Sequence, residues 1–237
     1  MNSKPPSPSR RAPRQHAAPE PSLNRKPDTK TLLIETAERL FGRHGLDGIS
    51  LREITAAAGQ ANSNVVQYHF KNKEGLISAI LEAHVEQFES QRREYLQKLP
   101  TDMPARARHL LKILWLPAMA IKGSDGSHSY CRFLLQYLIH PHKVQHPLVR
   151  FYDATESSDA LKQHVASLIE ATRMLRDLYR HLPVSILNLR LSALSMMFLA
   201  TVVEHDNRQF SESGETSKTF DVEPILDIAL AALNAPA

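Results

Sequence analysis

The sequence predicts an all-α protein, and three observations lead to that prediction. Apolar residues recur at helical spacing through most of the 237 residues. No stretch alternates convincingly between apolar and polar residues with the period of two that marks a strand. Proline and small polar residues divide the chain into segments of helical length, without an internal repeat. A hydrophobic content of 42% with only eight glycines fits a packed helical fold.

Composition argues against several classes of protein. Cys131 is the single cysteine, so an internal disulfide is excluded and nothing points to an oxidising compartment. The N-terminus lacks the apolar stretch of a signal peptide. The most apolar run, Leu191 to Val203, is too short to span a bilayer. We therefore expect a cytoplasmic protein with no membrane partner.

Positive charge is concentrated at the start of the chain. The net charge is +4, yet residues 1–30 hold seven basic and two acidic residues, which leaves the rest close to neutral. Residues 1–27 also hold seven prolines and show no apolar periodicity, so we expect a disordered tail. A basic arm on a neutral body indicates a polyanion partner such as DNA, or equally a solubilising tail.

The first helix is predicted to begin after Asp28, a good N-cap residue. Its buried face follows the helical spacing i, i+4, i+7, i+8 and comprises Leu33, Ala37, Leu40 and Phe41. Gly45, which can adopt the left-handed conformation of a C′ residue, is expected to end it. These residues open a domain that we place at 28–75.

Short helices fill the remainder of this domain. The pattern Ser50-Leu51-Arg52-Glu53 is a capping box that starts a helix over 51–58, and Gly59 ends it. Asn62 is the next good N-cap and predicts a third helix over 62–69. Val66 and Phe70, four residues apart, share its inner face.

A longer pattern follows at the end of the domain. Asn72 is expected to cap a fourth helix that runs unbroken from 73 to 98. The helical pattern then continues through a second, larger domain at 76–237. Its candidate helices are 104–121, 129–139, about 147–153, 158–181, 184–207 and 222–234.

Three short helices with a tight turn after the second form a helix-turn-helix unit, whose third helix enters the major groove of DNA. Polar side chains at Ser63, Asn64 and Gln67 project outward from that helix, with Tyr68 on its flank. Asn and Gln can pair with adenine and Ser with either base type, while Val65 can touch a thymine methyl group. Lys71 and Lys73 lie where the predicted fourth helix begins, next to the free backbone N–H groups of its first turn, which favour phosphate.

The same region resembles the TetR family of transcriptional regulators. The resemblance rests on Leu33-Ile34-Glu35-Thr36-Ala37-Glu38-Arg39-Leu40-Phe41, Gly45, Ser50, Ile54, Ala58-Gly59 and Tyr68-His69-Phe70-Lys71-Asn72-Lys73-Glu74-Gly75-Leu76. The sequence departs from the common family pattern by one additional residue before Phe70, where Gln60-Ala61-Asn62 replaces the usual turn.

The family implies roles for individual residues. Ser50 matches a cap that bonds a phosphate, Asn62 the cap of the recognition helix, and Gln67 or Tyr68 a tyrosine that contacts phosphate. The candidate DNA-binding set is Ser50, Asn62, Ser63, Asn64, Val65, Gln67, Tyr68, His69, Lys71 and Lys73. The alternatives are that Ser50 and Asn62 only cap helices, that His69 only packs, and that the outward residues form a solvated face.

The larger domain is expected to form a homodimer, because two readers one turn of DNA apart need a two-fold axis. Segment 184–207 carries two apolar stripes; one is Leu187, Leu191, Leu194, Phe198 and Val202, and the other is Ile186, Ala193, Met197, Ala200 and Val203. With Ile225, Leu226, Ala229 and Leu230 of the last helix, the first stripe is the predicted dimer interface. An intramolecular core is the alternative.

Family members usually hold a small-molecule effector in this domain, which implies a ligand-responsive repressor released from a palindromic operator. The candidate ligand residues are Trp115, Met119, Phe133, Gln136, Tyr137, Thr172, Arg173, Arg176 and Met197, with ordinary core packing as the alternative. Ligand binding is expected to shift the unbroken helix 73–98 and so separate the two readers. A regulator without a ligand remains the alternative.

Enzymatic and metal-binding functions are not expected. The sequence holds no nucleotide-binding loop, no hydrolase or metalloprotease motif and no paired cysteines. Glu204, His205 and Asp206 are adjacent on a helix and so point to different faces. His140, His142 and His146 are separated by prolines that break any helix aligning them. We therefore expect neither a cofactor nor a metal.

Overall fold

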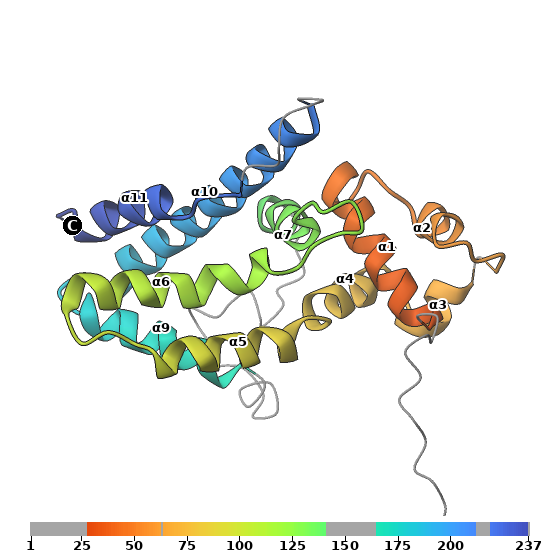
Figure 1. Cartoon of the computed structure of the whole chain (residues 1–237). Helices are drawn as coiled ribbons and strands as arrows, with labels where there is room; N and C mark the ends of the chain where they lie inside the picture. Colours follow the sequence, from red (N-terminus) through yellow and green to blue (C-terminus); the bar gives the residue numbers. More distant parts are fainter. Residues whose placement is uncertain (1–27, 63, 141–164, 212–218, 237) are drawn as a thin grey trace, which may run out of the picture.

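The computed structural model describes residues 28–62, 64–140, 165–211 and 219–236, and within them the fold is all-α, as predicted. Figure 1 shows two parts: a small group of helices at one end and an elongated helical body. We call residues 28–82 the reader and the described helices from Val85 onward the body. The predicted tail 1–27 and the candidate helix at 147–153 lie outside the described residues.

The reader contains α1 (Thr29–His44), α2 (Leu51–Ala57), α3 (Val65–Phe70) and α4 (Lys73–Glu82). Three of them, α1, α2 and α4, start where the sequence predicts: Asp28 Oδ1 accepts the Thr31 N–H at 2.7 Å, and Asn72 Oδ1 accepts the Gly75 N–H at 2.8 Å. Gly45 ends α1 as predicted, but its φ of 77° and ψ of 166° are an extended positive-φ conformation open mainly to glycine and not the left-handed one that the sequence suggested. The four helices enclose one buried cluster of Leu33, Ala37, Phe41, Ile54, Val66, Phe70 and Leu76.

The predicted unbroken helix over 73–98 is wrong. α4 ends at Glu82, and α5 (Val85–Gln97) begins only after His84, which has a non-helical φ of −109° and ψ of 2°. A tertiary contact accounts for the break, because His84 Nε2 lies 2.8 Å from the buried carboxylate of Glu38. The same ring meets Tyr130 edge-on, with centroids 4.9 Å apart. The apolar pattern cannot reveal such a contact.

The body consists of α5, α6 (Met103–Met119), α7 (Ser129–Ile139), α9 (Ala166–Leu178), α10 (Val184–Ser211) and α11 (Glu223–Asn234). α5, α6 and α9 pack on one another, and α10 and α11 lie against the other side of α6 (Figure 1). Segment 129–139 was predicted with the observed bounds. Of the predicted segment 158–181, the described part is helical from Ala166 to Leu178.

The reader and the body meet where α1 packs on α7. Gly42 permits the close approach, because a Cβ atom there would lie 3.2 Å from both Arg132 Cγ and the Phe133 backbone nitrogen. Next to it the Phe41 and Phe133 rings are 6.5 Å apart. The buried Glu38 carboxylate accepts the Ser129 hydroxyl at 2.5 Å. We call this contact region the α1–α7 seam.

α10 has two apolar faces with different surroundings. The stripe Leu187, Leu191, Leu194, Phe198 and Val202 is buried within the chain, whereas Leu189 is 66% exposed. By length and composition alone, Val184–Gln209 could cross a membrane, a test that core helices of soluble proteins also pass. Because only 33% of its most apolar window is buried, one face of α10 lacks an apolar cover within the described residues.

Candidate DNA-binding surface and ligand pocket

α3 presents its polar face to solvent in the orientation that the sequence predicts. Val66 and Phe70 are buried at 1% and 6% exposure, and the exposed residues Asn64, Gln67 and Tyr68 occupy the outer side, Tyr68 at 84%. Half-buried Val65 packs against the core, and the half-buried His69 ring lies edge-on to Tyr68 at 5.0 Å. Ser63 lies outside the described residues.

α3 starts later in the chain than residue 62, where the sequence predicted its start. The helix begins at Val65, because Asn62 first forms a turn in which its Oδ1 accepts the Asn64 N–H at 2.9 Å. Asn62 therefore bonds the N–H of Asn64, which is itself the N-cap residue of α3, and the prediction that Asn62 caps this helix is wrong. In the same turn, which is one residue longer than the common family pattern, the Gln60 side chain donates a hydrogen bond to the Ala58 carbonyl at 3.3 Å.

Ser50 is committed to the predicted capping box at the start of α2. Its Oγ accepts the Glu53 N–H at 3.3 Å and donates to Glu53 Oε2 at 2.7 Å, while its own N–H donates to the same carboxylate oxygen at 2.8 Å. The Ser50 hydrogen bonds lower the pKa of Glu53, which is exposed. A DNA phosphate would compete with Glu53 for the Ser50 hydroxyl.

Lys71 occupies a strained turn between α3 and α4 that the sequence did not reveal. Its φ of 69° and ψ of −50°, with the Asn72 N–H donating to the Phe70 carbonyl at 2.9 Å, define a classic γ-turn. Lys71 is the one non-glycine residue with positive φ among those described. Such strain costs about 1–3 kcal/mol and concentrates at functional sites. The exposed amine of Lys71 is thus held at the end of the recognition helix.

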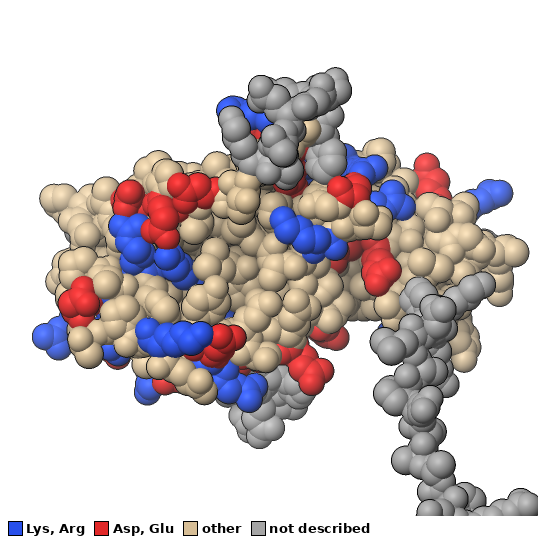
Figure 2. Space-filling view, viewed as in Figure 1, with Lys and Arg blue, Asp and Glu red and all other residues tan. Residues whose placement is uncertain are grey.

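Lys73 is less available than the sequence suggests. Its Nζ lies 5.7 Å from the centroid of the Phe41 ring, and the side chain is half-buried. The reader as a whole has no excess of positive charge, since residues 28–82 contain six basic and seven acidic side chains. Accordingly, the face of the reader seen in Figure 2 is mostly uncharged. The net positive charge of the chain comes from the segment before Asp28.

The predicted dimer residues require a correction. Leu187, Leu191, Leu194, Phe198, Val202, Ile225, Leu226 and Ala229 are buried inside their own chain, and Leu230 is partly buried against the same core. Side chains covered by α6 and α7 cannot also be covered by a second copy. The open face of α10 lies opposite and carries Leu189, Ala193, Met196, Ala200 and Val203, which overlaps the second predicted stripe.

The predicted ligand residues do not converge on one described cavity. The Trp115 ring stacks on Phe198 at 5.1 Å and its Nε1 donates to Ser195 Oγ at 3.1 Å. Phe133 and Tyr137 form an aromatic row behind Phe41, and Thr172 bonds its own helix. Arg173 is exposed, whereas Gln136, Arg176 and Met197 are half-buried. Met119 is the one that lines the pocket described next.

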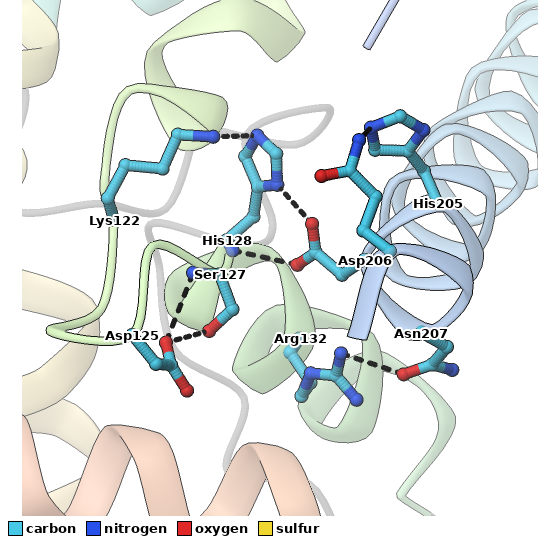
Figure 3. Close-up of polar contacts among 9 residues, drawn as sticks. Lys122, Asp125, Ser127, His128, Arg132, His205, Asp206 and Asn207 are labelled. Carbon is cyan, nitrogen blue, oxygen red and sulfur yellow. Dashed lines mark hydrogen bonds and ion pairs between the residues drawn. The ribbon is translucent and has the colours of Figure 1, made fainter. Parts of the chain in front are cut away.

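That pocket, of about 420 Å³, lies where the end of α6, the loop before α7 and the end of α10 meet. Its walls comprise Leu116, Met119, Ala120, Lys122, Gly126, His128, His205, Asp206, Gln209, Thr219 and Phe220. At its base His128 and Asp206, each 4% exposed, form a buried pair (Figure 3). Asp206 Oδ2 accepts the His128 backbone N–H at 2.8 Å, and Oδ1 lies 2.7 Å from His128 Nδ1.

The electrostatics of this pair follow from its hydrogen bonds. Burial opposes ionisation of Asp206, but the hydrogen bonds from His128 outweigh it and lower the pKa of Asp206. Because His128 Nδ1 donates to Asp206, His128 Nε2 is left to accept from the Lys122 ammonium group, which contacts it (Figure 3). A cation, an imidazole and a carboxylate thus form a chain from the pocket mouth into the core.

Sequence reasoning missed these residues, although one signal was present. Asp206 continues the buried stripe of α10, four residues after Val202, so a carboxylate occupies a core position. A charge on a buried stripe requires a partner. The partner, His128, lies 78 residues away, and nothing in the local pattern identifies it.

An exposed polar recognition helix behind a capped second helix, joined to a helical body, defines a helix-turn-helix transcriptional regulator. Comparison with known proteins agrees: residues 33–80 match the model of the bacterial regulatory proteins, tetR family. The reader thus matches the N-terminal region of the TetR family.

Two relatives extend this comparison. The chain is 27% identical over 156 residues to the HTH-type transcriptional regulator AcrR of Shigella flexneri. The matched region covers 64% of this chain and 69% of that protein. The crystal structure of a tetR family transcription regulator from Shewanella sp. PV-4 has a similar fold. It superposes with a TM-score of 0.53 at 17% identity, covering 87% of this chain and 96% of that chain.

Proposed function

We propose that this protein is a ligand-responsive repressor that binds a palindromic DNA operator as a homodimer and is released by a small molecule. The observation that carries the DNA-binding part is the outer face of α3, where Asn64, Gln67 and Tyr68 are exposed above the buried pair Val66 and Phe70. Amide side chains on a recognition helix can read adenine in the major groove. Lys71 and the α4 N-terminus supply contacts to adjacent phosphates.

The homodimer is proposed to form through the open face of α10 and α11. Leu189 and Ile228 are 66% and 54% exposed, and the exposed residues Ala193 and Ala200 lie on the same face of α10 as Leu189. Small residues seven positions apart allow a second helix to approach closely, and large apolar residues beside them gain burial. A two-fold axis through this face would pair two readers on one operator.

Light scattering during size-exclusion chromatography tests this interface. Leu189→Glu would place a charge in this interface, and we expect the dimer of the unmodified chain to become a monomer with unchanged helical circular dichroism. Ile139→Glu is the matched control, because Ile139 is 58% exposed at the end of α7, away from α10's open face. A dimer that survives Leu189→Glu but is lost with Ile139→Glu would contradict the proposed face.

Release from DNA is proposed to act through the α1–α7 seam, since α4 and α5 do not form the single rigid helix that the sequence suggested. The seam carries polar contacts that tie the reader to the body. Ser129 donates to Glu38 at 2.5 Å, and Arg43 Nη2 lies 2.5 Å from Asp125 in the loop before α7. Any ligand that moves α7 or this loop would therefore change the angle of α1.

The decisive experiment is selection of genomic DNA fragments by the purified protein, followed by sequencing. We expect an enriched palindrome whose half-sites lie about one helical turn, ~34–36 Å, apart. An Asn64→Ala protein is run in parallel and should enrich the palindrome less while retaining total DNA capture. Enrichment of no sequence, or of a site without two-fold symmetry, would refute the proposal. A palindrome whose binding resists every effector would instead favour a regulator without ligand control.

The basic segment before Asp28 is proposed to add phosphate contacts, because the reader alone has no net positive charge. Removal of residues 2–26 takes away six basic side chains and one acidic one. We expect weaker binding to all DNA sequences. The binding constant should also depend less steeply on salt concentration, by an amount that corresponds to at least about two phosphate contacts. An unchanged salt slope would leave this segment as a solubilising tail. The measurement is fluorescence anisotropy of labelled DNA at several salt concentrations.

A further inference from the structure

We propose that the pocket between α6, α7 and α10 binds a small amphipathic anion, with its acidic group on Lys122 and its apolar body against Leu116, Met119 and Phe220. The inference rests on the proposed function and adds to it the place and the chemical class of the effector. None of these positions except Met119 belonged to the ligand residues that the sequence indicated. The volume of about 420 Å³ lies within the range of about 300–1,000 Å³ typical of small-molecule sites.

The polar end of the pocket selects for an anion. The Lys122 ammonium group has three protons, of which one is directed at His128 Nε2, so two remain for a ligand. The Asp206 carboxylate directs both of its oxygens at His128, which lies between Asp206 and the Lys122 amine. His205 and Gln209, whose side chains lie 2.9 Å apart, stand on the α10 side of the same pocket and add polar contacts.

The His128–Asp206 pair holds the polar end in place before a ligand arrives. Two hydrogen bonds fix His128 relative to α10, and His128 in turn holds Lys122 (Figure 3). A lysine that is already oriented loses less side-chain entropy when it binds an anion than a free surface lysine does. Lys122 is a binding residue in this proposal, and His128 and Asp206 are positioning residues.

The opposite wall offers apolar surface. Leu116 and Met119 lie one turn apart on α6 and are half-buried, and Phe220 meets the His205 ring edge-on with centroids 5.3 Å apart. Methionine adapts to ligands of different shape. An acid attached to a short apolar chain or ring would therefore satisfy both ends, whereas an inorganic anion would leave the apolar wall uncovered.

The pocket is connected to the reader through one short loop. Lys122 and His128 bound the loop, and Asp125 between them accepts hydrogen bonds from both the N–H (3.1 Å) and the hydroxyl (2.6 Å) of Ser127. The same Asp125 carboxylate pairs with Arg43 on α1. A ligand bound to Lys122 would compete with His128 for the Lys122 ammonium group. The loop between these two residues would then move, and the Asp125–Arg43 ion pair would transmit the movement to α1.

Isothermal titration calorimetry with three probes of equal chain length tests the proposal: decanoate, decanol and decylamine. We expect the full-length protein to bind decanoate about tenfold more tightly than decanol, as one charge-assisted hydrogen bond provides, and decylamine more weakly than either. Lys122→Met should abolish the preference for decanoate over decanol, and Lys122→Arg should retain it. Lys98→Met, an exposed lysine at the C-terminal end of α5, is the control and should bind like the unmodified protein.

Equal affinities for the three probes, or an unchanged decanoate preference in Lys122→Met, would overturn the proposal. Calorimetry contains no DNA, so the result does not depend on the proposed function. A protein that binds decanoate through Lys122 but selects no DNA fragment would refute the repressor and leave this site standing. Conversely, a palindrome selected by a protein indifferent to the probe headgroup would retain the regulator and refute this site.

Discussion

The reader and the body are held together by contacts of different range. In the reader the helix caps join residues three positions apart, as between Ser50 and Glu53 or Asn72 and Gly75. At the pocket and the seam the polar contacts that hold separate helices together join residues far apart, with 78 positions between His128 and Asp206 and 91 between Glu38 and Ser129. The DNA-binding surface is therefore encoded locally, whereas the pocket and its connection to the reader exist only in the folded chain.

The largest test of this contrast is Phe41→Ala at the seam. Phe41 is fully buried in the reader and also meets Phe133 of α7, so its loss should cost about 3–5 kcal/mol of stability. Trp115, the single tryptophan, lies in the body and reports unfolding by fluorescence in urea. We expect the free energy of unfolding reported by Trp115 to fall by the whole of this cost in Phe41→Ala. In Phe41→Leu the loss should be less than half as large. An unshifted Trp115 transition would mean that the reader unfolds separately.

Asp206→Asn tests the long-range pair through its pH dependence. The hydrogen bonds from His128 lower the pKa of Asp206 in the folded state below the ordinary value of 3.8. The carboxylate thus stabilises the fold above pH ~4, and this stabilisation is lost as the pH falls through the lowered pKa. At pH 7 the variant should be about 1.5–3 kcal/mol less stable than the unmodified chain in urea unfolding. If the stability difference between the variant and the unmodified chain is the same at pH 7 and near pH 3, the Asp206 carboxylate is not stabilised by His128.

Asn64→Ala sharpens the reading of α3. Loss of an amide that reads a base should cost about 1–3 kcal/mol on the selected operator and relax the base preference at one position. Random DNA should bind as before, because the change removes no phosphate contact. Anisotropy titrations with operator and random duplexes measure both. Equal losses on the two duplexes would show that Asn64 does not read a base.

Lys71→Gly separates stability from DNA binding within the local turn. Glycine tolerates the φ of 69°, so the free energy of unfolding should rise by about 1 kcal/mol. The loss of the amine should weaken binding to all DNA and reduce the salt slope by about one. Lys71→Ala is the matched control, which should lose the same slope without gaining stability. If both variants retain the slope, Lys71 makes no phosphate contact.

Prediction from sequence succeeded where neighbouring residues decide the structure. The caps at Asp28, Ser50 and Asn72 and the inward pair Val66 and Phe70 follow from short-range patterns. The start of α3 was displaced because an Asn can bond the backbone in a turn as well as cap a helix. The break at His84 was missed because its cause, Glu38, belongs to another helix.

The sequence by itself determined the helical class, the reader and its outward polar face, since each depends on periodicity and capping within a few residues. Only the tertiary structure decided which face of α10 is buried, because two apolar stripes on one helix look alike until α6 and α7 cover one of them. It alone brought Lys122, His128 and Asp206 together around one pocket. Such a site depends on the packing of distant helices, and apolar periodicity identifies a buried face without naming the residue that will meet it.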